Sequence, residues 1–170
     1  MFDSLKRLMF SALRVLCTGY ARRKVARHGT GFTVNFPCLF SSTTEIGNYC
    51  HFNGIKVRGI GRLVIGDYFH SGDEILVITQ NHNYRDPRVL PYDEGLIARD
   101  VRIGAYVWIG SRVTLLPGVE LGDGCIVQAG AVVAGRFEAN AILGGNPARV
   151  MRYRDAETVA RLVAQGRFLL

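Results

Sequence analysis

The chain has 170 residues, 48% of them hydrophobic, so it is long enough for one folded domain with a core and too apolar to be disordered. Its net charge of +7 is concentrated in residues 1–28, which hold seven basic side chains and one acidic one, while the other 142 residues hold 14 basic and 13 acidic ones. The nearly neutral body has no basic stripe interleaved with aromatics, which argues against binding to nucleic acid, and no apolar run approaches the about 20 residues of a membrane-spanning helix.

Residues 2–27 are predicted to form a helix, because their apolar side chains recur with a spacing of three or four residues. These side chains belong to Phe2, Leu5, Met9, Ala12, Leu13 and Leu16. Two interpretations of the segment 1–30 stay open: the helix caps the rest of the domain, or it lies as a basic amphipathic helix on an anionic membrane surface. The segment lacks the apolar core and cleavage site of a signal peptide, so we expect a cytoplasmic protein, which under the second interpretation contacts the inner face of the membrane.

From residue 103 onward, a small aliphatic residue recurs at every sixth position. The series consists of Ile103, Ile109, Leu115, Leu121, Val127 and Val133, with a weaker Ala139. Looser series with the same spacing precede it, at Val34, Phe40, Ile46 and Phe52 and at Ile65, Ser71 and Val77. A period of six fits neither an α-helix nor an ordinary strand, and it is typical of a solenoid whose chain turns a corner every six residues. We therefore predict a mainly β solenoid over residues 31–148.

The six-residue pattern is interrupted over residues 80–100 by a polar insert that carries two prolines. Loops of this length inside a compact domain are usually functional or disordered. The pattern ends at Gly144–Pro147, and residues 149–170 are expected to form a helical tail. Within this tail, residues 155–165 are predicted to be a short helix with Asp155 as its N-cap, ending near Gly166.

Four cysteines, Cys17, Cys38, Cys50 and Cys125, form no CxxC pair and have no metal-ligand spacing. The last three lie four residues after a six-spaced apolar residue, where other hexads hold valine, alanine or threonine. We interpret them as small side chains packed inside the coil, which suits a reducing cytoplasm.

The repeated unit [Leu/Ile/Val]-Gly-x-x-[Val/Cys/Ala]-x resembles the hexapeptide-repeat acyltransferases over roughly residues 33–152. Val107-Trp108-Ile109-Gly110-Ser111, Leu116-Pro117-Gly118-Val119 and Gly145-Asn146-Pro147-Ala148-Arg149-Val150 resemble segments shared by galactoside, maltose and related sugar O-acetyltransferases. Asn81-His82-Asn83-Tyr84-Arg85-Asp86, followed by Pro91-Tyr92-Asp93-Glu94-Gly95, is similar to the exopolysaccharide branch, such as colanic-acid-type acetyltransferases. The resemblance implies a left-handed parallel β-helix with three faces, usually a homotrimer with active sites between subunits.

Transfer of an acetyl group to an alcohol requires a base that takes the hydroxyl proton, and imidazole is the side chain best matched to that task near neutral pH. Of the four histidines, His28 follows a basic run and is expected to face solvent, while His51 and His70 lie in the coil, where a structural role is expected. His82 lies at the root of the insert, where the family carries its catalytic histidine, so the resemblance implies that it is the general base. The alternative is a loop histidine that only hydrogen-bonds the backbone.

Asn53 matches an asparagine that the sugar acetyltransferases place near the acceptor, although an asparagine at a coil corner is also a good turn residue. Asn83, Tyr84 and Asp86 in the insert are further candidates for acceptor binding. The alternative for these three residues is hydrogen bonding within the loop.

For the co-substrate acetyl-CoA, the resemblance points to the later coils. Gly110, Ser111, Ala129 and Gly130 would face the pantetheine arm, since small residues permit close approach. Trp108 would wall the thioester pocket, unless it is a core or interface anchor.

Arg149 and Arg152 would meet the phosphates of coenzyme A, unless they belong to a solvated C-terminal arm. The chain departs from many relatives after the Ala-Gly corner, where it reads Ala134-Gly135-Arg136 in place of Thr-Lys. Either Arg136 supplies the missing cation or the phosphate grip differs.

The favoured function is therefore acetyl-CoA-dependent O-acetyl transfer to a sugar or exopolysaccharide precursor, directly in a ternary complex and without a metal. One alternative is an N-acetyltransferase acting on a nucleotide-linked amino sugar, and another is a non-catalytic β-helix scaffold. A γ-type carbonic anhydrase shares the coil but requires a close His-x4-His pair, whereas successive histidines here are 23, 19 and 12 residues apart.

Overall fold

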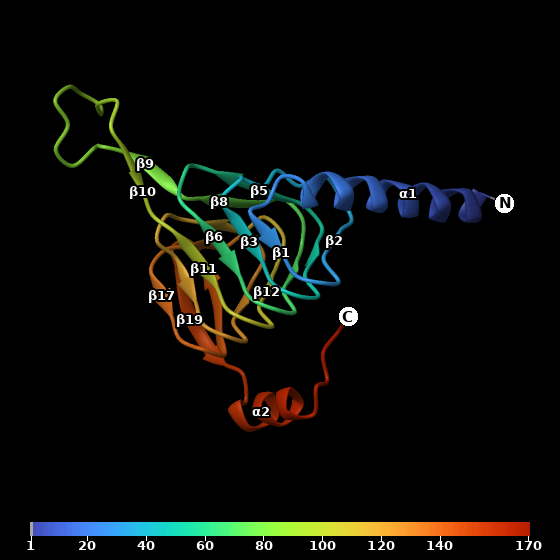
Figure 1. Cartoon of the computed structure of the whole chain (residues 1–170). Helices are drawn as coiled ribbons and strands as arrows, with labels where there is room; N and C mark the ends of the chain where they lie inside the picture. Colours follow the sequence, from blue (N-terminus) through green and yellow to red (C-terminus); the bar gives the residue numbers. More distant parts are fainter. Residues whose placement is uncertain (1) are drawn as a thin grey trace.

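The computed structural model describes residues 2–170 and shows a three-sided solenoid of short strands, with a helix near each end of the chain (Figure 1). Face A contains β1 (Arg27–His28), β3 (Thr44–Ile46), β6 (Leu63–Ile65), β11 (Val101–Ile103), β14 (Glu120–Leu121) and β17 (Arg136–Phe137). Face B contains β2 (Thr33–Val34), β4 (His51–Phe52), β7 (His70–Ser71), β12 (Trp108–Ile109), β15 (Ile126–Val127), β18 (Ala141–Gly145) and β19 (Ala148–Tyr153). Face C contains β5 (Ile55–Arg58), β8 (Ile75–Ile78), β13 (Thr114–Leu115) and β16 (Val132–Val133).

The six-spaced aliphatic residues form the core of this solenoid, as the sequence predicts. Ile109, Leu115 and Val133 are completely buried, and the other members of the regular series are at most 4% exposed. Ile103 pairs with Leu121, eighteen residues later, so one turn of the coil contains three hexads. Neighbouring strands of the three faces run parallel, with the exception of the pair β18 and β19 on face B.

The last turn of the coil departs from the predicted period. Leu121 pairs with Phe137, sixteen residues later, and Val127 pairs with Leu143. Ala139, the seventh member of the predicted series, is exposed, while Phe137 packs against the core in that row. This turn is two residues short, so the assignment of Ala139 to the core was wrong.

The cysteines of the coil are buried, as predicted. Cys38 and Cys50 are at most 4% exposed, and burial raises the pKa of their thiols to about 12 and about 11, respectively. Burial also raises the pKa of Cys125, while Cys17 of the N-terminal helix is only half-buried. The three coil cysteines are therefore packing residues without thiolate character.

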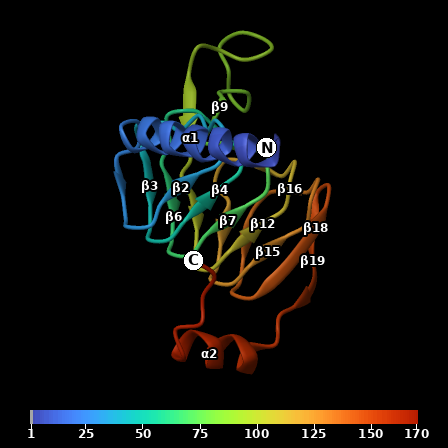
Figure 2. The same ribbon diagram turned by 90° about the vertical axis from the view of Figure 1, so that its right-hand side faces the viewer.

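The N-terminal helix α1 (Phe2–Arg22) projects away from the coil along most of its length (Figure 1), and in Figure 2, seen from that side, it lies in front of the upper part of the coil. It is shorter than the predicted 2–27, because Arg27–His28 already form the first strand of face A. Only its last turns pack on the coil: Ala21 is 1% exposed, and the Thr18 hydroxyl accepts a hydrogen bond from the Val34 amide at 2.9 Å.

The apolar stripe of α1 does not supply this contact. Of the predicted stripe, Met9 and Leu16 are more than 60% exposed, whereas Leu13 is half-buried. Leu8 and Val15, which extend the exposed stripe, are also more than 60% exposed. The helix therefore contacts the coil through Thr18 and Ala21, and both interpretations of the segment 1–30 remain predictions. None of the helices within residues 2–170 is both long and apolar enough to cross a bilayer.

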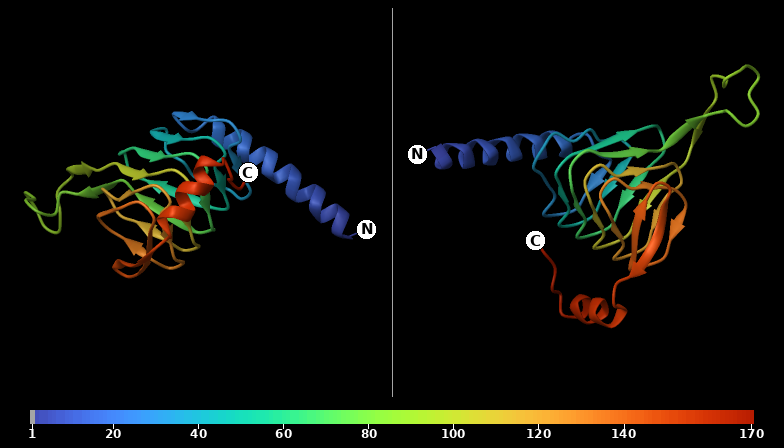
Figure 3. Two further views of the ribbon diagram at one scale, coloured as in Figure 1. Left: turned by 90° about the horizontal axis from the view of Figure 1, so that it is seen from below. Right: turned by 180° about the vertical axis from the view of Figure 1, so that it is seen from behind.

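The insert leaves the coil as an antiparallel hairpin, β9 (Gln80–His82) and β10 (Leu96–Ala98), which carries the loop 83–95 well beyond the body (Figures 1 and 3). At the other end, β18 and β19 form a second hairpin that the sequence pattern did not predict, so the tail is not helical from residue 149. The helix α2 (Ala156–Ala164) follows, and the Asp155 carboxylate caps it by accepting from the Thr158 amide at 2.8 Å, as predicted.

The C-terminal residues return to the coil after α2. The Phe168 ring stacks on Tyr68 with centroids 3.9 Å apart and lies 6.1 Å from the Tyr106 ring. The Leu169 carbonyl lies 3.3 Å from Nε2 of His70. These contacts attach the C-terminal residues to turns of the coil that lie about 100 residues earlier in the sequence.

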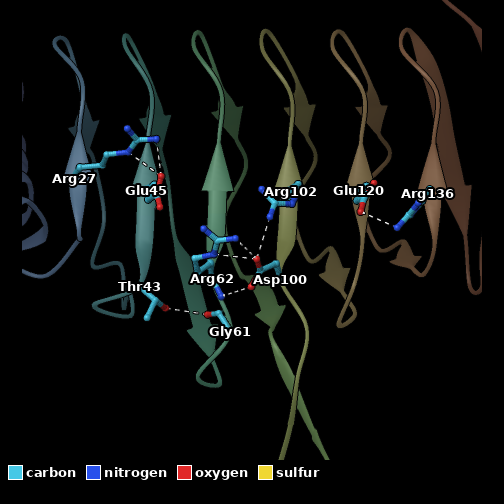
Figure 4. A network of polar contacts seen from close by, with 9 residues as sticks. All are labelled: Arg27, Thr43, Glu45, Gly61, Arg62, Asp100, Arg102, Glu120 and Arg136. Carbon is cyan, nitrogen blue, oxygen red and sulfur yellow. Dashed lines mark hydrogen bonds and ion pairs between the residues drawn. The ribbon is translucent and has the colours of Figure 1, made fainter.

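Face A carries a row of ion pairs across its outer surface (Figure 4). Arg27 pairs with Glu45 at 2.6 Å, both Arg62 and Arg102 pair with Asp100, and Arg136 pairs with Glu120 at 3.2 Å. These side chains are partly to largely solvent-exposed, so this face is a water-facing surface.

Candidate active site

The candidate residues lie on two different edges of the three-sided coil. Edge BC, the series of turns between faces B and C, contains residues 53–54, 72–74, 110–113 and 128–131. Edge CA, between faces C and A, contains residues 59–62, the insert 79–100, 116–119 and 134–135. Within one subunit, candidate residues on the same edge lie near one another, whereas those on edges BC and CA lie apart.

His82 ends β9 on the hairpin of edge CA and is exposed. Its imidazole stacks on the Tyr92 ring, with centroids 4.0 Å apart and planes inclined by 20°. No described residue forms a hydrogen bond with either ring nitrogen, so the predicted alternative of a backbone-bonded histidine is not observed. The stack fixes the orientation of the ring while both nitrogens stay available to a substrate.

Asp93 organises the loop that holds this stack. Its carboxylate accepts hydrogen bonds from the amides of Gly95 at 2.8 Å and Arg88 at 3.1 Å, and from the Asn83 side chain at 2.9 Å. These donors hold the pKa of the Asp93 carboxyl below its usual range, led by the Gly95 amide. The sequence analysis missed both Tyr92 and Asp93 as functional residues, although an aspartate two residues before a glycine is a turn signal.

The other candidates in the insert, Asn83, Tyr84 and Asp86, differ in their contacts. Asn83 is engaged within the loop, since its amide donates to the Asp86 carbonyl at 2.8 Å as well as to Asp93. Tyr84 is 55% exposed, and the Arg85 guanidinium lies 5.9 Å from its ring centroid. Tyr84 lines a hollow of about 510 Å³ between the hairpin and edge CA, whereas Asp86 is an exposed loop residue.

Asn53 lies on edge BC, away from the hairpin of its own chain. Its Oδ1 accepts from the Asn35 side chain at 2.8 Å, and its Nδ2 donates to the Ser71 carbonyl at 2.7 Å. These bonds fit the predicted turn role, and they also fix an amide that faces two neighbouring hollows of about 310 and 370 Å³.

The four small residues predicted for the pantetheine arm come together on adjacent turns of edge BC. The Gly130 amide donates to the Ser111 carbonyl at 2.9 Å. A Cβ on Gly110 would lie 2.7 Å from the Ala129 nitrogen, so the close stacking of these turns requires glycine there. Ala129 and Gly130 are exposed, and nothing lies within 4 Å of the position of a Cβ on Gly130, which leaves this strip open.

Trp108 and the two arginines continue the strip onto face B. Trp108 is 55% exposed, so it is not a core anchor. Its register runs through Ile126 and Ile142 to Arg152 of β19. Arg149 of the same strand donates from Nη1 to the Ala148 carbonyl at 2.9 Å. An open, small-residue strip that ends in two cations fits a long, polyanionic co-substrate such as acetyl-CoA.

Arg136 does not belong to this strip. It lies on face A and pairs with Glu120 (Figure 4). Because faces A and B point in different directions, Arg136 does not extend the strip within one subunit, and its proposed role as the missing cation remains a prediction.

The remaining histidines have local roles. His28 is exposed and donates from Nδ1 to the neighbouring Gly29 carbonyl at 2.8 Å. His51 stacks on His70 with centroids 4.8 Å apart and shares a hydrogen bond with the Thr33 hydroxyl. Burial, followed by the charges of His70 and Arg14, lowers the pKa of His51. In the part of the chain that the structure describes, no group of three His, Cys, Asp or Glu residues is arranged to hold a metal ion.

A family model described as bacterial transferase hexapeptide (six repeats) matches residues 100–135. WbbJ of Escherichia coli K12, which is named for O-acetyl transfer in lipopolysaccharide biosynthesis, is 29% identical over 127 residues, covering 71% of this chain and 62% of the relative. A chloramphenicol acetyltransferase of Agrobacterium fabrum is 34% identical over 154 residues, covering 72% of this chain and 74% of the relative. The chain thus spans less than two thirds of WbbJ and nearly three quarters of the Agrobacterium protein.

Among solved structures, a hexapeptide-repeat acetyltransferase of Vibrio cholerae in complex with acetyl coenzyme A is similar with a TM-score of 0.70. The two are 27% identical, and the match covers 80% of this chain and 76% of that chain. The match confirms the left-handed parallel β-helix that the sequence resemblance implied. Together with the curated relatives, it shows that the chain belongs to the hexapeptide-repeat family of acetyltransferases.

Proposed function

We propose that this protein is an acetyl-CoA-dependent O-acetyltransferase that acts on a hydroxyl of a sugar or exopolysaccharide precursor, with His82 as general base. The observation that carries the proposal is the state of His82: an imidazole held by the Tyr92 ring, with both nitrogens free, on a projecting hairpin that Asp93 keeps ordered. A saccharide acceptor is supported by the name of the Escherichia coli relative and by the insert, which is similar to that of exopolysaccharide acetyltransferases.

In the proposed reaction, His82 removes the proton from the acceptor hydroxyl as its oxygen attacks the thioester carbonyl. The tetrahedral intermediate then collapses, the carbon–sulfur bond breaks, and the His82 imidazolium returns the proton to the departing thiolate. The acetyl group passes directly between the two substrates. A covalent intermediate on a coil cysteine is disfavoured, because Cys38, Cys50 and Cys125 are buried thiols with raised pKa values.

The division between edges supports a trimer with active sites between subunits. His82 projects from edge CA, while Asn53 and the co-substrate strip lie on edge BC. One hairpin therefore serves edge BC of a neighbouring copy rather than its own. The outer rows of faces B and C carry apolar side chains such as Trp108, Ile126 and Val132 on their later turns, whereas face A is charged, so B and C are the faces we expect to lie between subunits.

We also propose that α1 rests on the inner surface of the membrane. Its exposed apolar stripe, which includes Leu8 and Leu16, lies next to a concentration of basic residues. This combination is the pattern of a helix that binds an anionic bilayer surface, and it would bring the enzyme to acceptors that are built there.

The test is a kinetic comparison of the wild type with His82→Ala, measured as thiol release from acetyl-CoA across a panel of neutral and phosphorylated saccharides, with chloramphenicol as a non-saccharide acceptor. We expect saccharide acetylation that falls by about 10²-fold or more in the variant. An amine is a better nucleophile than a hydroxyl, so a small loss with amino-sugar acceptors would favour the N-acetyltransferase alternative. A folded wild-type protein that does not bind coenzyme A would instead support the scaffold.

A further inference from the structure

A hollow of about 310 Å³ lies between α1 and the first turns of edge BC. Its lining comes from Phe10, Ser11 and Arg14 of the helix and from Asn35, Phe36 and Asn53 of the coil. The volume lies at the lower end of the about 300–1,000 Å³ that small-ligand sites occupy. The residues at 11, 14 and 18 follow helical spacing, so the side of α1 that faces the hollow offers Ser11 and Arg14 beside Phe10, while Leu8, Val15 and Leu16 are exposed.

Arg14 brings a positive charge into this hollow without a counterion. Its side chain is exposed to solvent at the rim of the hollow, and no residue whose side chain the structure describes, that is Lys6 and residues 8–170, forms an ion pair or hydrogen bond with it. Its charge is close enough to the coil to contribute to the lowered pKa of His51. The residues that line this hollow include no carboxylate. Asp73 and Glu74 line the next hollow, where Glu74 pairs with Arg112 at 2.7 Å.

Two amide donors accompany the guanidinium. Asn35 uses one Nδ2 hydrogen to reach Asn53, and Asn53 uses one to reach the Ser71 carbonyl, so each NH₂ group keeps a second hydrogen. A guanidinium beside two amide donors is a donor set that proteins use for phosphate oxygens.

The hollow is continuous with the site proposed for acetyl transfer. Asn53 and Phe36 line both this hollow and the next one, of about 370 Å³, which extends to Asp73. The Asp73 amide in turn donates to Ser111 Oγ at 3.3 Å, at the start of the co-substrate strip. An acceptor that lies along edge BC would therefore place one end at Arg14 and its sugar near Asn53.

We propose that this hollow is an anion subsite, in which Arg14 binds the phosphate or diphosphate that carries the saccharide acceptor. The inference rests on the proposed O-acetyl transfer and specifies the class of its substrate: a saccharide phosphoester. The phosphate can belong to a polyprenyl lipid or to a nucleotide. The position of Arg14 on the helix whose outer side is apolar favours the lipid, because the hollow would then lie at the bilayer surface.

The binding test uses Arg14→Gln, with Arg14→Lys as the charge-preserving variant and Arg161→Gln on the exposed helix α2 as the matched control. Calorimetric titration of pyrophosphate and of a sugar 1-phosphate into the protein without coenzyme A should show an affinity reduced by about tenfold or more in Arg14→Gln. Arg14→Lys should recover part of the affinity, and Arg161→Gln should match the wild type. Equal affinity of the wild type and Arg14→Gln, with unchanged circular dichroism, overturns the subsite.

The kinetic test compares one saccharide in three forms: a neutral methyl glycoside, a nucleoside-diphosphate sugar, and a polyprenyl-diphosphate sugar in phosphatidylglycerol vesicles. Arg14→Gln should raise KM for both phosphorylated forms and leave the methyl glycoside unchanged. A preference for the lipid form supports the membrane source, and a preference for the nucleotide form retains the subsite with the other source. If every form is acetylated equally by the wild type and by Arg14→Gln, the subsite is wrong while O-acetyl transfer stands; if no form is acetylated, the proposed function itself fails.

Discussion

Placing the hairpin and the co-substrate strip on different edges predicts that two inactive subunits complement each other. One variant, His82→Ala, lacks the base on edge CA. The other, Ala129→Trp, blocks the co-substrate strip on edge BC. Because Ala129 is exposed, we expect the indole ring to point into solvent and leave the core undisturbed. Each homotrimer should lose about 10²-fold or more of its activity.

The size of the recovery follows from counting sites. Each site combines the hairpin of one protomer with edge BC of the next. In trimers assembled randomly from equal amounts of both variants, half of the hairpins carry His82 and half of the edges carry Ala129. About one quarter of all sites then contain both intact parts. A trimer that contains both variants has one such site in three, so the purified mixed trimers should regain about 33% of wild-type turnover per site.

The assay is thiol release by trimers that carry one tag from each variant, purified over both tags after co-expression. Separately purified homotrimers, mixed just before the measurement, give the baseline. If doubly tagged trimers are no more active than this baseline while both parents remain trimeric and folded, each site lies within one chain and the reasoning from edges fails.

Four further outcomes are expected. Asp93→Ala should lower kcat by releasing the loop that holds the Tyr92–His82 stack, with little change in Tm, as kinetics and thermal melts would show. Leu115→Ala should reduce the free energy of unfolding by about 2–5 kcal/mol in urea titrations, because its side chain is completely buried. The folded-state pKa of His51 lies below its ordinary value of 6.5, so the unfolded chain takes up a proton first as the pH falls; stability should therefore decrease below about pH 6.5, and less so in His51→Gln, in melts at pH 5 to 8. Leu16→Glu should abolish sedimentation with phosphatidylglycerol vesicles, and strong retention would contradict the membrane role of α1.

The coil was predictable because its inward positions obey one simple rule. Every regular turn of the coil contains eighteen residues and three corners. Leu115 therefore pairs with Val133 on the next turn, and both side chains are buried. The rule fails where a turn is shortened. The six-residue spacing gives no sign that Phe137, and not Ala139, pairs with Leu121. The β18–β19 hairpin was missed for a related reason, since its pairing is antiparallel and has no six-residue period.

The site was predictable in its residue types but not in its arrangement. His82 and the small residues of edge BC follow from the motifs, yet their separation onto two edges depends on which corner each turn occupies. The loop order that comes from Asp93 depends on backbone amides, which no residue pattern reveals. Likewise, the spacing in α1 predicts an apolar stripe, but only the structure shows that Thr18 and Ala21, rather than this stripe, contact the coil.

The insertion of Phe168 beside Tyr68 has a consequence for how the protein matures on the ribosome. Synthesis proceeds from the N-terminus, so the turn of the coil that carries Tyr68 is exposed to chaperones and solvent before Phe168, which packs on it, has been made. The stack of Phe168 on Tyr68 forms only after Phe168 has left the exit tunnel. A tag fused after Leu170 is therefore expected to disturb the packing of Phe168 on Tyr68, a late step of folding. An insertion in the distant β9–β10 hairpin is not expected to disturb this contact.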